Sequence, residues 1–293
     1  MGHILVLLSA LFFSLSSYYG KIVTNITDMS GVITSFSRFL IGTIGMLIYI
    51  LYKRKSFKPN DFKPIGIRAV FNSLAIISLS SALNYTTITN SNMLNMTYPV
   101  FVVLLAPLVL KETIKKSTYI YLVAIMFGSY VIANPSFGSI NIGDLMSFVS
   151  AMLAGVSIVS LKQASNKNEG YLIVFYVMLI GTIINIPFSL EYIINFDYNG
   201  LIYVVLAGSM GFIAQILLTE GYKYVDSSTG SLLSSSRILM SAVIGIIFLG
   251  EPFDLRITLG MILIGGSLVG VSGYFDKKKG NVDTSTKDIN DLD

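Results

Sequence analysis

Arg237 is the residue whose type and position most clearly predict chemistry. It lies in SSSRILM, inside the long apolar run GSLLSSSRILMSAVIGIIFLG. With a membrane-spanning helix beginning near Ser228, Arg237 is expected about 14 Å deep at about 1.5 Å per residue, close to the middle of a bilayer. A charge there costs at least about 2.5 kcal/mol on insertion scales, so the side chain should face the protein interior or an aqueous cavity.

The Arg237 guanidinium can bind a carboxylate or a phosphate through two hydrogen bonds. The alternative is a structural arginine that is satisfied by Glu220 or by helix carbonyl groups. We favour the binding role, and it predicts a small zwitterionic or anionic substrate, for instance an amino-acid-like compound.

A second group of polar residues occurs earlier, in the sequence TNSNMLNMTYPVF. Asn92, Asn95 and Tyr98 follow one another at steps of three, which places them close together on a helix surface. Their amides and phenol could recognise an amino, ribose or heterocyclic group, but association between helices explains the asparagines equally well. Pro99 removes a helix hydrogen bond, which would suit a gating element.

Two further charged residues fall within apolar segments, and for both we favour a structural role. Arg38 is close enough to the outer end of its segment for its charge to reach the headgroup region. Glu220 could accept a coupling proton if burial raised its pKa, but an interfacial acid that neighbours Lys223 is the stronger interpretation. Weaker substrate-binding candidates are Asn72, Gln215 and Tyr18.

The residues needed for catalysis or metal binding are scarce in this sequence. The chain has no cysteine, and its single histidine is His3. We therefore expect no Cys-ligated metal, no Ser-His catalytic pair, no cofactor and no enzymatic activity.

The elements that must position these residues are membrane-spanning helices. The chain of 293 residues is 53% hydrophobic and 12% charged, whereas soluble domains carry about 25% charged residues. A helix of about 20 apolar residues spans a bilayer. Ten segments meet this description, approximately 4–20, 31–52, 65–83, 87–110, 118–133, 144–161, 171–190, 200–222, 228–250 and 257–274.

The distribution of positive charge predicts the orientation. With a cytoplasmic N-terminus, 16 of the 20 Lys and Arg residues fall on the cytoplasmic side, which places both termini there. They are Lys53, Arg54, Lys55, Lys58, Lys63, Arg68, Lys111, Lys115, Lys116, Lys162, Lys167, Lys223, Lys277, Lys278, Lys279 and Lys287. The net charge of +4 is thus explained by topology, and we expect no nucleic-acid partner.

An internal repeat divides the chain into two halves. ALFFSLSSYYGKI resembles AMLAGVSIVSLKQ at an offset of 141 residues, and the stretch from Leu83 to Thr113 resembles the stretch from Tyr222 to Pro252 at an offset of 139. Because each half holds five helices, an odd number, the second half is expected to be inverted in the membrane. The predicted units are residues 4–133 and 144–274, joined by a loop at 134–143 and followed by a disordered cytoplasmic tail at 275–293.

These features resemble a known family. The two five-helix repeats, TYPVFVVLLAPLVLKET and FLGEPFDLRITLGMILIGGSLVGV are similar to the EamA-like branch of the drug/metabolite transporter superfamily. Residues 67–99 and 217–252 look most like the group of S-adenosylmethionine carriers and related metabolite permeases. The resemblance implies ten helices, cytoplasmic termini and alternating access, and it leaves the substrate open.

We therefore predict an all-α integral membrane protein that acts as a secondary transporter of a small polar metabolite in the cytoplasmic membrane, as a monomer or a homodimer. Alternatives are an uptake carrier for a nucleoside-like or vitamin compound of the S-adenosylmethionine or riboflavin type, and a non-transporting membrane scaffold. The residues predicted to bind substrate are Arg237, Asn92, Asn95, Tyr98, Asn72, Gln215 and Tyr18.

Overall fold

The fold is built from helices throughout the part of the chain that is described. A computed structural model describes residues 1–82, 85–86, 88–133, 141–249 and 253–272. The helices are α1 (Gly2–Ile26), α2 (Gly31–Tyr52), α3 (Phe62–Ala82), α4 (Ile88–Asn95), α5 (Tyr98–Leu110), α6 (Lys116–Ala133), α7 (Ile142–Ser165), α8 (Gly170–Ile194), the short 3₁₀-helix η1 (Tyr198–Gly200), α9 (Leu201–Gly221), α10 (Ser227–Ser234), α11 (Ser236–Leu249) and α12 (Leu255–Val271).

The lengths and compositions of these helices are those of membrane spans. Eight helical stretches in the described residues are long and apolar enough to cross a bilayer, and Lys116–Ile132 and Leu255–Val271 are shorter apolar helices. Large apolar side chains such as Leu108, Ile120 and Ile262 face outward, while the backbone groups are satisfied within the helices, as lipid requires. The chain is a multi-pass membrane protein, and the predicted all-α fold with ten apolar segments is confirmed.

The fourth and ninth segments are each broken into two helices. Between α4 and α5, the amide of Thr97 donates to Leu94 O at 3.1 Å in a tighter turn. Pro99 has no N–H to donate to the carbonyl of Asn95, which explains why α4 ends there.

The break between α10 and α11 has no proline. Instead, the hydroxyls of Ser234 and Ser235 donate to Gly230 O at 2.9 Å and Ser231 O at 3.3 Å. Such side-chain bonds compete with the helix backbone. The two breaks coincide in the repeat, since α10 begins and ends 139 residues after α4.

The packing of the helices repeats when the two halves are exchanged. The first helix of each half packs along the third helix of the other: α1 along α9, and α7 along α3. The second helices, α2 and α8, pack on each other, and so do the fifth, α6 and α12. Two repeats related by a twofold axis in the membrane plane produce this pattern.

Individual contacts follow the same rule. A Cβ on Gly2 would lie 2.7 Å from Tyr224 Cβ, and a Cβ on Gly143 would lie 2.9 Å from Tyr85 Cβ. Gly143 follows Gly2 by 141 residues and Tyr224 follows Tyr85 by 139, which are the two offsets of the sequence repeat.

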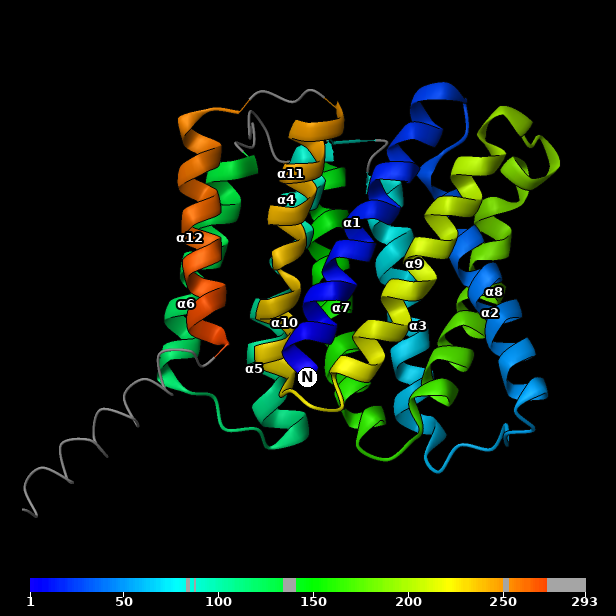
Figure 1. Cartoon of the computed structure of the whole chain (residues 1–293), viewed down its shortest axis with the longest axis horizontal. Coiled ribbons are helices and arrows are strands. Elements are labelled where there is room, and N and C mark those ends of the chain that lie inside the picture. The colour runs from blue at the N-terminus through cyan, green and yellow to red at the C-terminus, as the bar shows by residue number, and fades with distance from the viewer. Residues whose placement is uncertain (83–84, 87, 134–140, 250–252, 273–293) are drawn as a thin grey trace, which may run out of the picture.

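Two groups of helices result. The α1 bundle contains α1, α2, α9, α10 and α11, and the α7 bundle contains α3, α4, α5, α7 and α8. The bundles meet where α2 packs on α8 and where α5 packs on α10. Helices α6 and α12 form a pair at one side of the molecule (Figure 1).

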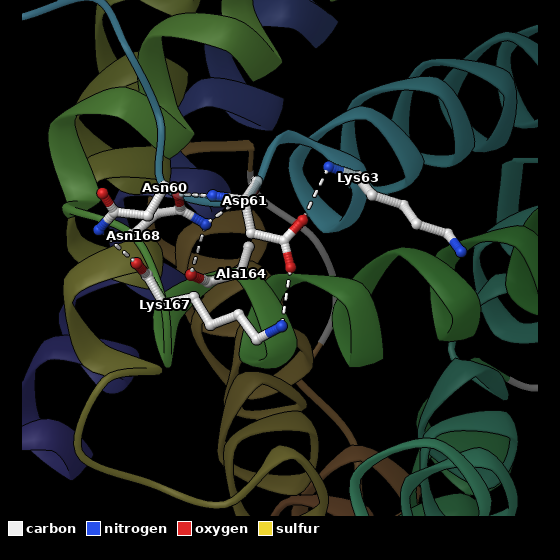
Figure 2. Close-up of polar contacts among 6 residues, drawn as sticks. All are labelled: Asn60, Asp61, Lys63, Ala164, Lys167 and Asn168. Carbon is white, nitrogen blue, oxygen red and sulfur yellow. Dashed lines mark hydrogen bonds and ion pairs between the residues drawn. The ribbon is translucent and has the colours of Figure 1, made fainter.

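The connections α2–α3, α5–α6, α7–α8 and α9–α10 lie at the same end of the molecule as the N-terminus (Figure 1). At this end a polar clasp joins the α2–α3 and α7–α8 connections (Figure 2). Asp61 N donates to Asn168 Oδ1 and Asn168 Nδ2 donates to Asp61 O, both at 3.0 Å, and Lys167 Nζ lies 2.8 Å from Asp61 Oδ2. The clasp fastens the start of α3 to the end of α7.

At the opposite end, Thr27 and Gly200 meet at the equivalent positions of the repeat, 141 residues before Asn168 and 139 after Asp61. A Cβ on Gly200 would lie 3.0 Å from Thr27 Cγ2 and 2.8 Å from Met29 Cε. This counterpart contact is therefore largely apolar.

Some sequence predictions lie outside the described residues. They are most of the predicted loop at 134–143, the end of the second unit at 273–274 and the predicted tail at 275–293.

Candidate functional site

Arg237 lies in the first turn of α11, directly after the break in the ninth segment. Its Nη2 donates to Ser17 Oγ at 2.9 Å, and its guanidinium carbon lies 5.6 Å from the centre of the Phe13 ring. Both contacts are made with α1. The backbone carbonyl of Arg237 also accepts a hydrogen bond from Ser14 Oγ at 3.1 Å.

Arg38 on α2 approaches the same aromatic ring. Its guanidinium carbon lies 5.9 Å from the centre of Phe13 and 5.0 Å from the centre of Phe39. Its aliphatic part packs over Gly211 on α9, where an added Cβ would lie 3.0 Å from Arg38 Cγ. Although we favoured a structural role for Arg38, its position next to Arg237 makes it a candidate for substrate binding.

Arg68 is a third arginine of this region, and the sequence interpretation missed it. From the distribution of charge, Arg68 was expected on the cytoplasmic side of the membrane. The structure instead places it inside α3, where it is buried with 2% exposure. Its Nη1 donates to Ser157 Oγ at 2.7 Å, and Ser157 Oγ donates to Arg68 O at 2.9 Å. A signal was available, because Arg68 falls within the apolar segment 65–83 itself.

Electrostatic interactions link Arg237 and Arg68 to both Arg38 and Tyr98. The charges of Arg237 and Arg68 both reach Arg38, and both also reach the phenol of Tyr98. The Tyr98 hydroxyl donates to Ser231 O at 3.2 Å, which joins α5 to α10 between the two bundles. The site therefore draws on helices from both bundles.

The partners that hold these arginines are neutral. Among the described residues, no carboxylate forms an ion pair with Arg38, Arg68 or Arg237, and Glu220 pairs with Lys223 at 2.8 Å instead. Glu220 therefore has Lys223, and not Arg237, as its ion-pair partner.

Each arginine also breaks the symmetry of the halves. The residues 139 positions away are Val177 for Arg38, Ala207 for Arg68 and Tyr98 for Arg237. Since these counterparts are all uncharged, the positive charge is a local addition to an otherwise repeated framework.

Of the two candidate asparagines in the fourth segment, Asn95 makes a contact between helices. Asn95 Nδ2 donates to Ser150 Oγ at 2.8 Å, so this side chain joins α4 to α7. The same interface holds a bond of 2.8 Å between the hydroxyls of Ser91 and Ser147. For Asn95 the contact is the helix association that we considered as an alternative; the side chain of Asn92 lies outside the described part.

The remaining candidates lie around the arginines or at helix contacts. Asn72 is half-buried one turn after Arg68, and Gln215 is buried on α9 one turn after Gly211. Tyr18 stacks on Phe248 of α11 with ring centres 5.6 Å apart. Pro99 is buried in the first turn of α5, where its missing N–H leaves no helix bond unmade.

Several known proteins are similar to this chain. It is 27% identical over 278 residues to an uncharacterized transporter of Helicobacter pylori, covering 90% of this chain and 91% of that protein. It is 24% identical over 233 residues to the pseudopaline exporter of Pseudomonas aeruginosa, covering 78% and 81%. It is 20% identical over 231 residues to the S-adenosylmethionine uptake transporter of Rickettsia prowazekii, covering 78% and 79%.

The fold has a counterpart among solved structures. One crystal structure superimposes on this chain with a TM-score of 0.76 at 15% sequence identity. The superposition covers 94% of this chain and 98% of the chain in that crystal structure. The sequence profile of the EamA-like transporter family matches residues 1–134 and 141–273. The match spans nearly the whole chain, which therefore belongs to the EamA-like transporter family.

Proposed function

We propose that this protein is a secondary transporter that moves a small polar metabolite with at least one anionic group, probed best by amino-acid-like compounds. The observation that carries the proposal is the pair Arg38 and Arg237, whose guanidinium groups both lie within 6 Å of the Phe13 ring centre. The positive charges of Arg237 and Arg38 repel each other, and an anion that binds both groups offsets the repulsion.

The surroundings of the pair support substrate binding. Arg237 lies in the first turn of α11 beside the break in its segment, and broken helices at mid-membrane form the binding sites of many transporters. Its side-chain hydrogen bond within the protein is to the hydroxyl of Ser17, so the guanidinium keeps further N–H donors for a ligand. Transport would proceed by rocking of the α1 and α7 bundles about this site.

We also propose that the protein is not an enzyme. The charges of its connections support an orientation with the N-terminus in the cytoplasm. The connections at the N-terminal end carry Lys53, Arg54, Lys55, Lys111 and Lys167. An excess of positive charge marks cytoplasmic loops. We propose that both termini lie in the cytoplasm and that the protein lies in the cytoplasmic membrane.

A nucleoside-like substrate is the second candidate, because one relative is named an S-adenosylmethionine uptake transporter. S-adenosylmethionine has one carboxylate but also two cationic groups, which three arginines would repel. The arginines therefore favour the anionic substrate class.

The test is transport in proteoliposomes with a radiolabelled mixture of amino acids. Arg237→Ala should reduce uptake by about a hundredfold or more, since truncating one member of a desolvated charge pair costs about 2–5 kcal/mol. Insertion of the variant is checked by its monodisperse elution in detergent.

Arg54→Gln is the matched control, because this arginine is exposed in the α2–α3 connection. Uptake close to that of the native protein in Arg237→Ala would rule out the assigned role. Uptake of S-adenosylmethionine but of none of the amino acids would support the second candidate.

A further inference from the structure

We infer that the substrate carries two separate anionic groups, one bound by Arg237 and Arg38 in the α1 bundle and the other by Arg68 in the α7 bundle. This inference rests on the proposed function and narrows its substrate class to compounds with two carboxylates, such as dicarboxylates and acidic amino acids.

The first support is the state of the Arg68 side chain. Arg68 has 2% exposure, and its Nε is buried without a hydrogen-bond partner among the described residues. Its Nη1 donates to the hydroxyl of Ser157, a neutral residue. A buried guanidinium with a free donor is costly to leave unpaired, and a ligand carboxylate matches its geometry.

The second support is the location of Arg68 relative to the other two arginines. Arg68 is on α3, whereas Arg38 and Arg237 are on α2 and α11. Both Arg68 and Arg237 interact electrostatically with the phenol of Tyr98. The Tyr98 hydroxyl donates a hydrogen bond to Ser231 O in the other bundle. Arg68 therefore adds a separate positive group on the other side of the same site.

The third support is the symmetry of the framework. Ser157 Oγ donates to the carbonyl of Arg68 at 2.9 Å, and in the other half Ser16 Oγ donates to the carbonyl of Ala207 at 2.7 Å. The backbone contact is thus made equally well with an alanine. The arginine side chain is not needed for this helix contact, which leaves recognition as its role.

A substrate with two anionic ends would connect the bundles in a way that a single anion cannot. One end would bind the α1 bundle and the other end the α7 bundle, so the bound substrate would stabilise the arrangement in which the three arginines converge. Binding and the relative position of the bundles would then be coupled.

The experiment compares ligands that differ by one charge at nearly constant size. Dissociation constants are measured from the thermal stability of the purified full chain in detergent. The three pairs are L-glutamate with L-glutamine, L-aspartate with L-asparagine, and succinate with succinamate. In at least one pair the diacid should bind about tenfold more tightly than its amide, or better.

Variants of Arg68 separate recognition from packing. Arg68→Gln should reduce the preference for the diacid to less than about threefold, while Arg68→Lys, which keeps the charge, should retain most of it. A preference is a ratio within one protein, so it does not depend on the stability of the variant. Arg54→Gln should keep the full preference.

The outcomes distinguish this inference from the proposed function. If amides bind as tightly as diacids, or if Arg68→Gln and Arg68→Lys change the preference equally, the inference is wrong and a single-anion site at Arg237 stands. If none of the six compounds binds, the inference is also wrong, and the proteoliposome assay with Arg237→Ala decides the proposed function independently.

Discussion

The hydroxyl oxygens of Thr43 on α2 and Thr182 on α8 lie 3.0 Å apart, and the two residues are counterparts in the two halves, 139 positions apart. Each hydroxyl also bonds to its own helix, to Phe39 O at 2.8 Å and to Met178 O at 2.9 Å. A residue that touches its own counterpart lies on the axis that exchanges the halves.

Neighbouring contacts agree with this position of the axis. A Cβ on Gly42 would lie 2.6 Å from Met178 Sδ, and a Cβ on Gly181 would collide with the Phe39 ring. Gly181 and Met178 follow Gly42 and Phe39 by 139 residues, so the two contacts exchange. We therefore expect the halves to move least relative to each other at the centre of the α2–α8 interface.

We predict that a disulfide at this centre forms and leaves transport largely intact. In Thr43→Cys/Thr182→Cys the sulfur atoms replace two oxygen atoms that lie 3.0 Å apart, so they need to approach by only about 1 Å to form a disulfide bond of about 2 Å. The chain has no other cysteine, so the bond can be read from the intact mass before and after reduction. Transport is compared in oxidised and reduced proteoliposomes.

The single variants Thr43→Cys and Thr182→Cys control for loss of the hydroxyls. Complete loss of transport on oxidation, with recovery on reduction, would show that α2 and α8 must separate at this point.

We predict that Gly211→Ala impairs anion binding through Arg38. The added methyl group would meet the side chain of Arg38 and push the guanidinium from its place over Phe13. Gly266→Ala on α12 is the matched control, because nothing lies within 4 Å of its Cβ. Ligand affinity from thermal stability should fall by about tenfold or more in the first variant only, since a displaced charge loses about 1.4 kcal/mol or more of pairing.

An equal affinity in both glycine variants would mean that Arg38 can move aside without cost to the site. It would return Arg38 to the structural role that its sequence position suggests.

We predict that Glu112→Gln loosens the start of α10. The carboxylate of Glu112, which follows α5, accepts from Ser227 N at 3.0 Å and from Ser227 Oγ at 2.7 Å. A carboxylate at a helix N-terminus stabilises it by about 0.5–2 kcal/mol through hydrogen bonds and the helix dipole. Hydrogen exchange of the α10 amides should accelerate by about threefold to thirtyfold.

Glu191→Gln serves as its control, because Glu191 is exposed in the last turn of α8. Unchanged exchange in α10 would mean that the bonds from Ser227 are as strong with an amide as with a carboxylate.

We predict that the clasp at the N-terminal end weakens in acid. The hydrogen bond from Lys167 is the main cause that lowers the pKa of Asp61 below its usual value. Because the folded pKa lies below the unfolded one, the stabilisation is present above about pH 4 and is lost as the pH falls through the folded pKa. The melting temperature of Asp61→Asn should therefore be lower than that of the native protein near neutral pH, with the difference shrinking in acid.

Lys167→Gln should show the same convergence, because it removes the partner that shifts the carboxyl. A difference in melting temperature that stays constant down to pH 3 would assign the effect of Asp61→Asn to the hydrogen bond that Asp61 Oδ1 accepts from Lys63 N.

The fold was largely predictable, because an apolar stretch of sufficient length has few alternatives to a membrane helix. The second segment was predicted with the bounds of α2 itself, and the repeat offsets of 141 and 139 reappear in the contacts of Gly2 and Gly143. The break before Pro99 was foreseeable from its missing hydrogen bond. The break at Ser235 was not, because serine weakens a helix only through local bonds that the sequence does not reveal.

The site was less predictable, because it depends on contacts between distant segments. Arg237 was identified by its depth in an apolar run, but the approach of Arg38 to the same ring requires the packing of α1 against α2, α9 and α11. Arg68 was missed because a basic residue near the end of an apolar segment resembles a flanking charge. Asn95 faces α7, and a spacing of three residues cannot distinguish a partner helix from a ligand.

The clasp between Asp61 and Asn168 and the apolar contact between Thr27 and Gly200 occupy the same pair of positions in the repeat, at opposite ends of the molecule. Two copies of one unit, inserted in opposite senses, expose identical positions to different sides of a membrane. Selection at these positions therefore acts separately on each side, while selection at Thr43 and Thr182 acts on both copies at once. Positions at which the two copies differ in residue type therefore indicate where the two sides of the membrane impose different requirements. Positions at which the copies are alike, such as Thr43 and Thr182, indicate where the requirements are the same.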